Sequence, residues 1–211
     1  MRRKIVFSAL VAAISLGAFV ICRHWLGYTG LLILFLITVL FGYNSVKLYG
    51  KVHPESGKRA VYEYLWIAFA FYFYFLFLMT FSVKRSSPRF IFESKERLRY
   101  YLRFRCNFVP FNTIRGMLKL KFSFRFILVN LFGNLVALAP LGFFLPRLIR
   151  PARKFFPFLI ISTLVVVFIE SVQFLFGVGA CDIDDLILNV TGAVIVFWIL
   201  KIPVFKKFVE M

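Results

Sequence analysis

The sequence from Pro157 to Leu200 is PFLIISTLVVVFIESVQFLFGVGACDIDDLILNVTGAVIVFWIL. It holds two apolar runs, at 157–176 and about 186–200, with a short acidic turn between them. A helix rises about 1.5 Å per residue and needs roughly 20 apolar residues to cross a bilayer. The two runs therefore predict two membrane-spanning helices, which lie antiparallel because the turn between them is short.

Acidic residues are concentrated in this part of the chain. Four of the nine carboxylates lie between Glu170 and Asp185. A charged side chain at the centre of a bilayer costs about 3 kcal/mol or more unless it is paired, so it marks a functional site by default. The cluster is therefore the first place to look for function.

The composition of the whole chain fits a membrane protein. Hydrophobic residues make up 61% and charged residues 17% of the sequence, whereas the apolar share of a soluble domain is about 45–50%. This predicts an all-α integral membrane protein. Its 211 residues suffice for about six spans in one domain, within a range of five to seven. The expected spans are 5–22, 25–45, 61–83, 126–146, 157–176 and 186–200.

A basic segment separates the third span from the fourth. Residues 84–125 hold twelve Lys or Arg against two acids. We expect an interfacial loop, part of which forms an amphipathic helix with apolar residues facing lipid, namely Leu98, Tyr101, Leu102 and Phe104 or Phe108. The basic residues of the chain lie between apolar runs and form no stripe on a soluble face, which argues against nucleic acid. Anionic lipid is the favoured partner.

The distribution of Lys and Arg also predicts orientation, because short cytoplasmic loops are enriched in these residues. Short basic stretches at the N-terminus, before the third span, between the fourth and fifth spans and in the tail 201–211 favour six spans. Both termini are then cytoplasmic. The turn at 177–185 has no basic residue and lies outside. The basic loop then also lies outside, against the rule, unless one span is miscounted.

The three cysteines, Cys22, Cys106 and Cys181, show no CxxC spacing and are odd in number. This gives little support to a zinc site or a disulfide framework. We expect each to be a buried apolar residue.

Polar residues on three of the predicted helices are expected at one depth. Residues three or four apart share a helix face, and antiparallel neighbours bring these positions into the outer half of the membrane. The residues are Asn130 and Asn134 on the fourth span, Glu170 and Gln173 on the fifth, and Asp182, Asp185 and Asn189 at the start of the sixth.

Three interpretations of these polar residues stay open. The first is a structural hydrogen-bond network, in which Gly133, Gly142 and Gly192 let helices approach closely. The second is a site for a polar ligand such as a lipid headgroup, a sugar or a hard cation. Carboxylate and amide oxygens suit Mg²⁺, Ca²⁺ or Mn²⁺, but no cofactor is required. The third is acid–base catalysis by Glu170 and Asp185.

The same residues belong to an ordered set of short motifs. Asn107-Phe-Val-Pro110-Phe-Asn-Thr113 is followed by Asn130 through Gly133-Asn134 and by Pro140, Gly142 and Pro146. Glu170-x-x-Gln173 comes next, and then Asp182-Ile-Asp184-Asp185 with Asn189 and Gly192. Over residues 105–200 this set resembles the VanZ-like family. Residues 1–83 and the tail 201–211 lie outside the resemblance.

The resemblance implies a small integral membrane protein of Gram-positive type. The founding member is associated with reduced susceptibility to teicoplanin, a glycopeptide that targets peptidoglycan precursors. The resemblance brings no enzymatic mechanism, and it adds Asn107, Pro110 and Asp184 to the ligand or network residues. Many members carry an Arg shortly before the aspartates, where this chain has Gly177 to Cys181. This leaves open which cation, if any, partners Asp182.

Two functions follow as hypotheses. The first is a non-enzymatic membrane protein that binds or shields a cell-envelope component, such as an anionic lipid or a lipid-linked cell-wall precursor, and so changes glycopeptide access. The alternative is a membrane enzyme or transporter that acts on a lipid-linked or headgroup substrate through the intramembrane carboxylates and amides. The sequence does not indicate the oligomeric state.

Overall fold

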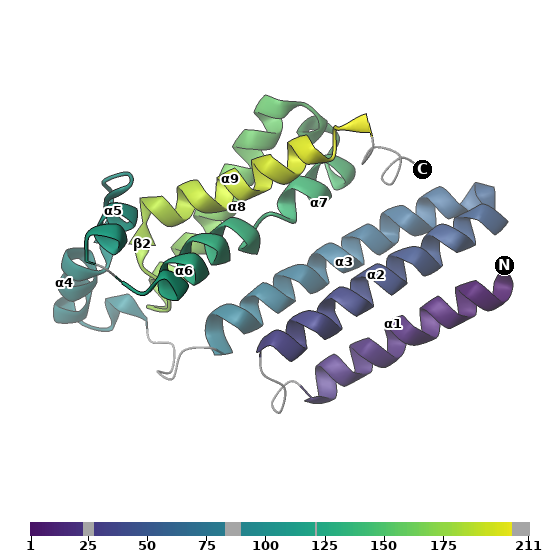
Figure 1. Ribbon diagram of the computed structural model, residues 1–211, viewed down its shortest axis with the longest axis horizontal. Helices are drawn as coiled ribbons and strands as arrows, with labels where there is room; N and C mark the ends of the chain where they lie inside the picture. Colours follow the sequence, from purple (N-terminus) through teal and green to yellow (C-terminus); the bar gives the residue numbers. More distant parts are fainter. Residues whose placement is uncertain (23–27, 83–89, 121, 204–211) are drawn as a thin grey trace. The chain divides into compact units, whose positions relative to one another are not determined.

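The computed structural model describes residues 1–22, 28–82, 90–120 and 122–203. The chain divides into two compact units, residues 1–79 and 80–210, and each is described by itself. Both units are built from helices, which Figure 1 shows in chain order. Five helical segments of the described residues are long and apolar enough to cross a membrane: Arg2–Ile21, Gly30–Val52, Pro54–Met79, Phe124–Leu148 and Phe155–Leu175. The fourth of them consists of two consecutive helices. The prediction of an all-α, multi-pass membrane protein is therefore confirmed.

The first unit consists of three long helices, α1 (Arg2–Cys22), α2 (Tyr28–Val52) and the greater part of α3 (Pro54–Ser82). Aromatic rings fill the space between them. Phe19 is fully buried and meets the ring of Phe71 edge-on at 5.1 Å between centroids, and Phe35 stacks on Phe75 at 4.7 Å. Phe71 and Phe75 of the third predicted span thus serve helix packing.

Small polar side chains add hydrogen bonds between α1 and α2. The hydroxyls of Ser15 and Thr38 lie 3.0 Å apart, and the Asn44 amide donates to Ser8 Oγ at 2.8 Å. Such groups commonly join helices within a membrane, where water is absent.

The second unit contains the predicted site. Its elements are η1 (Ile91–Glu93), α4 (Lys95–Phe104), β1 (Cys106–Asn107), α5 (Asn112–Lys119), α6 (Phe124–Ala137), α7 (Leu141–Leu148), η2 (Arg150–Arg153), α8 (Phe155–Leu175), β2 (Cys181–Asp182) and α9 (Ile183–Ile199). Helix α9 packs against α6, α7 and α8. Its Phe197 stacks on the fully buried Phe158 of α8 at 4.3 Å, which closes the core at the end of α9 remote from the acidic turn.

The predicted fourth span, 126–146, is broken into two helices. Helix α6 ends at Ala137, and α7 begins at Leu141 after a turn that contains Pro140. Proline has no N–H to donate and its ring clashes with the carbonyl four residues earlier, so the first helix cannot continue through it. Figure 1 shows α6 and α7 as separate segments. The sixth predicted span corresponds to α9, which has 17 residues and is shorter than the five helical segments named above.

The basic segment is more structured than a loop. Its described residues form η1, α4, β1, α5 and the start of α6, whereas 84–89 and Lys121 lie outside the described residues. Helix α4 is the amphipathic helix that we expect. Tyr100, Leu102 and Phe104 are at least half exposed on it, but the hydroxyl of Tyr101 binds within the protein.

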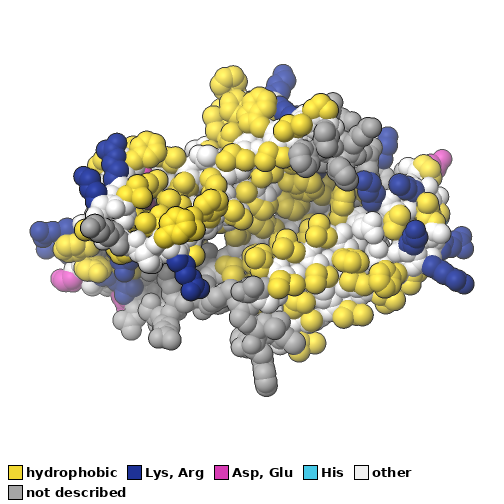
Figure 2. All heavy atoms as spheres, viewed as in Figure 1, with side chains coloured by type: hydrophobic (Ala, Val, Ile, Leu, Met, Phe, Trp, Pro, Cys, Tyr) yellow, Lys and Arg dark blue, Asp and Glu magenta, His cyan; other side chains and the backbone are white. Residues whose placement is uncertain are grey.

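Large apolar side chains are exposed along the long helices. Figure 2 shows hydrophobic side chains spread over the visible face of the molecule. Ile14, Val129 and Leu164 are 70%, 64% and 62% exposed. A water-soluble protein seldom exposes apolar patches of this extent, whereas side chains that face lipid are exposed in this way.

Candidate functional site

A short parallel strand pair brings the 105–113 stretch to the start of α9. Cys106 pairs with Cys181 and Asn107 with Asp182, and the Cys181 N–H donates to the Arg105 carbonyl at 2.9 Å. The motif around Asn107 and the aspartate motif are far apart in the sequence, yet the pairing places them side by side. The site can therefore be built from this junction outward.

Asp182 is the N-cap of α9 and accepts three hydrogen bonds. Its Oδ1 accepts from the Asp184 N–H at 2.9 Å and from the Asn107 amide at 3.0 Å, and its Oδ2 accepts from the Thr113 hydroxyl at 2.5 Å. An N-cap carboxylate satisfies a helix N–H that has no partner within the helix. Asp182 therefore fastens both Asn107 and Thr113 to the start of α9.

Asp184 is 1% exposed and accepts from two backbone N–H groups at the start of α5. These donors are the N–H of Phe111 and, at 3.1 Å, the N–H of Ile114. Phe111 has φ 63°, a left-handed conformation that a residue with a Cβ seldom adopts. It follows Pro110 in a turn closed by the bond from the Asn112 N–H to the Val109 carbonyl at 3.2 Å. Pro110 is exposed, so its place in the motif is explained by this turn.

Asp185 receives its hydrogen bond from another helix. The Asn134 amide of α6 donates to Asp185 Oδ1. Asn130, one turn earlier on α6, donates instead to the Phe126 carbonyl of its own helix at 2.8 Å. The structure thus brings one of the two α6 amides to the aspartates and leaves the other out.

The remaining predicted residues lie at the end of α8 and within α9. Gln173 accepts through its backbone carbonyl from the N–H groups of Val178 and, at 3.3 Å, Gly179, and so shapes the turn after α8. Glu170 is half-buried on α8, close enough for its charge to act on Cys181. Asn189 is 4% exposed, and its Oδ1 has no hydrogen-bond partner among the described residues.

The three aspartates therefore differ in how many of their carboxylate oxygens accept hydrogen bonds. Both oxygens of Asp182 and both of Asp184 accept hydrogen bonds from the 107–114 stretch or from α9 itself. Asp185 accepts one hydrogen bond from the described residues. We call Asp182 and Asp184, with their donors, the clamp, because they hold the 107–114 stretch on α9. Asp185 and Asn189 each have a side-chain oxygen that accepts no hydrogen bond from the described residues.

Several clamp donors were not among the predicted site residues. The Thr113 hydroxyl lies within the motif that carries the family resemblance, and this is the one signal that could have singled it out. The backbone N–H groups of Phe111 and Ile114 leave no trace in the sequence, because any residue except proline supplies one.

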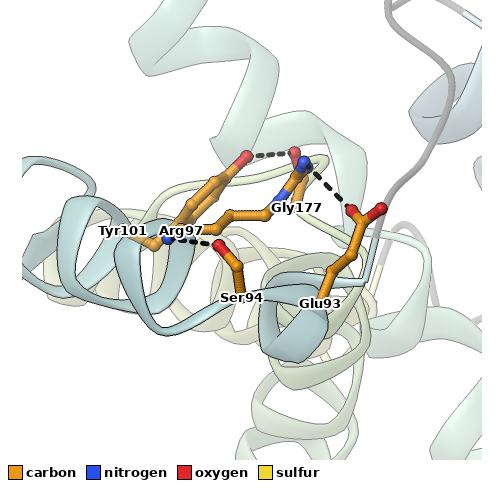
Figure 3. A network of polar contacts seen from close by, with 5 residues as sticks. All are labelled: Glu93, Ser94, Arg97, Tyr101 and Gly177. Carbon is orange, nitrogen blue, oxygen red and sulfur yellow. Dashed lines mark hydrogen bonds and ion pairs between the residues drawn. The ribbon is translucent and has the colours of Figure 1, made fainter.

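A second set of contacts joins α4 to the turn that precedes the aspartates. Figure 3 shows Tyr101 reaching Gly177, whose carbonyl accepts from the Tyr101 hydroxyl at 2.6 Å. On the same helix, Arg97 forms an ion pair with Glu93 at 3.6 Å, and Ser94 caps the helix by accepting from the Arg97 N–H. Within the described ranges, no Lys or Arg forms an ion pair with Asp182, Asp184 or Asp185. Their hydrogen-bond donors are side-chain amides, the Thr113 hydroxyl and backbone N–H groups.

The described residues contain no obvious cluster of metal ligands. Among the residues that the structure describes, no three His, Cys, Asp or Glu side chains are grouped so that they could hold a metal ion. A divalent cation at Asp185 and the neighbouring amide oxygens stays a prediction.

The unequal roles of the two α6 amides give a testable difference. We expect Asn134→Ala to destabilise the protein by about 1 kcal/mol, because Asp185 loses its donor in a half-buried position. Asn130→Ala should change the free energy of unfolding by less than about 0.5 kcal/mol, since that amide only bonds to its own helix. Thermal unfolding of the purified variants in detergent measures both. Equal losses of stability in the two variants would contradict the assignment of Asn134 to the network.

Comparisons with known proteins agree with the order of motifs along the chain. A search of curated proteins and a search of solved structures found no match. The family model of VanZ/LLP1 matches residues 66–206, which begins within α3 and contains all the residues of the clamp, together with Asn134, Asp185 and Asn189. Because the match covers well over half of the 211 residues, the chain belongs to the VanZ/LLP1 family.

Proposed function

We propose that this protein binds or shields a polar component of the cell envelope, without catalysing a reaction, and thereby lowers susceptibility to glycopeptides such as teicoplanin. The resemblance to the VanZ-like family motivates the link to glycopeptides. The proposed ligand is an anionic lipid or a lipid-linked cell-wall precursor. Both classes carry hydroxyl, amide or phosphate groups at the depth of a membrane surface.

One observation carries the proposal: the start of α9 holds acceptor oxygens that the fold leaves unused. Asp185 accepts one hydrogen bond, from Asn134, and the Oδ1 of the buried Asn189 has no partner among the described residues. Most buried polar atoms in proteins are hydrogen-bonded, so an exception calls for an explanation. Donor groups of a sugar, a peptide or a headgroup would supply the missing partners.

The proposal places the acidic turn at the outer surface of a bacterial cytoplasmic membrane, with both termini in the cytoplasm. The distribution of Lys and Arg supports this orientation. A ligand of the outer leaflet would then reach Asp185 next to the 107–114 stretch. The exposed Phe108 and Val109 of that stretch, 68% and 62% exposed, would contact lipid beside the site.

The experiment is expression of the protein in a teicoplanin-sensitive host. We expect the wild-type protein to raise the inhibitory concentration of teicoplanin at least about fourfold, and Asp185→Asn to abolish most of this increase, because the amide loses the charge and one acceptor oxygen. Asn130→Ala is the matched control, since its side chain bonds within α6. Immunoblots of membrane fractions establish equal amounts of each variant. Labelling of Phe108→Cys on intact cells, in a background without native cysteines, checks the orientation.

Each outcome decides between the functions. An unchanged inhibitory concentration with wild-type protein at the cell surface would overturn the proposal. The alternative, a membrane enzyme or transporter that uses Asp185 and Glu170, is motivated by the single hydrogen bond of Asp185, which leaves that carboxylate able to exchange a proton or an ion. A new mass among the lipid-linked precursors of expressing cells, lost in Asp185→Asn, would favour the enzyme.

A further inference from the structure

Two cysteines that are far apart in the sequence face each other beside the clamp. Cys106 of β1 and Cys181 of β2 are partners in the parallel register, and the next pair in the register is Asn107 with Asp182. The bond from the Cys181 N–H to the Arg105 carbonyl, at 2.9 Å, fixes this alignment. The proximity of the thiols is therefore a consequence of the backbone pairing.

The geometry of the pair is that of residues able to form a disulfide. Neighbouring strands lie about 4.8 Å apart, and the Cα atoms of disulfide-bonded cysteines lie about 4.4–6.8 Å apart. The two thiols are close enough to influence each other's pKa, and both are half-buried free thiols in the structure. We expected each cysteine to be a separate buried apolar residue, whereas Cys106 and Cys181 lie side by side.

We propose that Cys106 and Cys181 form a reversible intramolecular disulfide, which covalently locks the 107–114 stretch onto the start of α9. This modification site is independent of the ligand proposed above. It lies one residue before Asn107 and one before Asp182, so the bond would fix the register on which the clamp depends.

The reaction needs an oxidant, and an organic disulfide supplies it. One cysteine thiolate attacks a sulfur of the organic disulfide, forms a mixed disulfide and releases one organic thiolate. The second cysteine then attacks the protein sulfur of that mixed disulfide and releases the other. The two cysteines lose two electrons and two protons in total, and the organic disulfide becomes two thiols.

The surroundings of the two thiols indicate which one attacks first. Burial raises the pKa of Cys181, and contact with Cys106 and the charges of Glu170 and Asp182 raise it further. Burial also raises the pKa of Cys106, but the contact with the Cys181 thiol opposes that rise, and no carboxylate adds to it. Cys106 is thus the first nucleophile, and oxidation becomes faster as the pH rises, because a larger fraction is thiolate.

Peptide mapping of the Cys22→Ser variant tests the proposal. The purified protein is incubated with excess oxidised glutathione at pH 8.5 in detergent, then digested and analysed by mass spectrometry without reduction. We expect one linked species that joins the Cys106 and Cys181 peptides, two hydrogen masses lighter than the sum of the two peptides. We also expect a melting temperature at least about 5 °C above that of the reduced protein, because the bond closes a long loop. Dithiothreitol should reverse both changes.

The controls make every outcome decisive. In Cys22→Ser with Cys181→Ser, Cys106 can form only the glutathione mixed disulfide, which shows that the reagent reaches it. One or two glutathione adducts on the paired protein without a linked species, or two unmodified thiols, would overturn the proposal. The same mapping of the wild-type protein gives the answer if removal of Cys22 impairs folding. A linked peptide that contains Cys22 instead would also count against the pair.

Discussion

Gly192→Ala is expected to destabilise the protein by about 3 kcal/mol, which lowers the melting temperature by roughly 6–12 °C. A Cβ on Gly192 would lie 2.8 Å from the carbonyl carbon of Leu135 on α6 and closer still to its oxygen. Because the obstacle is backbone, no side-chain rotation relieves it, and α6 and α9 must move apart. The bond between Asn134 and Asp185 lies on the same pair of helices and would lengthen with them.

Gly133→Ala is the matched control on α6. A Cβ at Gly133 meets nothing within 4 Å among the described residues, and alanine is favoured over glycine in a helix by about 1 kcal/mol. The two substitutions add the same methyl group, yet we expect opposite signs. Thermal unfolding of both variants in the same detergent measures the difference. A similar loss of stability in both would mean that the close contact of Gly192 with Leu135 does not limit the packing of α9 against α6.

The sequence prediction was most successful where composition and length decide the outcome. Runs of about 20 apolar residues cannot be accommodated in water, and a membrane admits them chiefly as helices, so the long helices follow from composition. Hydropathy does not reveal the break between α6 and α7, because the residues on both sides of Pro140 are apolar. The two prolines of this run do not locate it either, because the helix breaks near Pro140 whereas Pro146 lies inside α7.

Helical spacing placed the polar residues on shared helix faces but did not separate their roles. Asp182 precedes α9 as its N-cap, so it is not the first member of a stripe that continues through Asp185 and Asn189. Spacing also gives no rotation of one helix relative to another. For this reason Asn130 and Asn134 looked equivalent, although one bonds to its own helix and the other to Asp185.

The three glycines illustrate the same limit. In one of the three interpretations of the polar residues, Gly133, Gly142 and Gly192 allow close helix contact. Gly192 lies against Leu135, and Gly142 lies against the Ala193 carbonyl of α9, but Gly133 faces no described atom within 4 Å. The pairing of Cys106 with Cys181 could not be predicted either, because a parallel pair of two-residue strands has no periodic signal.

The second large effect is expected at Asp184, which accepts hydrogen bonds from two backbone N–H groups at the start of α5. Asp184→Ala should destabilise the protein by about 3 kcal/mol, because the N–H groups of Phe111 and Ile114 both lose their acceptor in a site that is 1% exposed. Phe111 also loses the contact that favours its left-handed conformation. Hydrogen exchange should therefore accelerate at least about tenfold at these two amides, since each 1.4 kcal/mol lost changes the opening equilibrium tenfold.

Two further variants separate the loss of acceptors from the loss of charge. Asp184→Asn keeps the shape and one acceptor oxygen, so we expect about half of the destabilisation seen with alanine. Glu96→Ala removes one negative charge from the exposed face of α4 and should change stability by less than about 0.5 kcal/mol. If Asp184→Ala left exchange at Phe111 and Ile114 unchanged, the 107–114 stretch would be held by Asp182 alone. The clamp would then reduce to the N-cap of α9 with its bonds to Asn107 and Thr113.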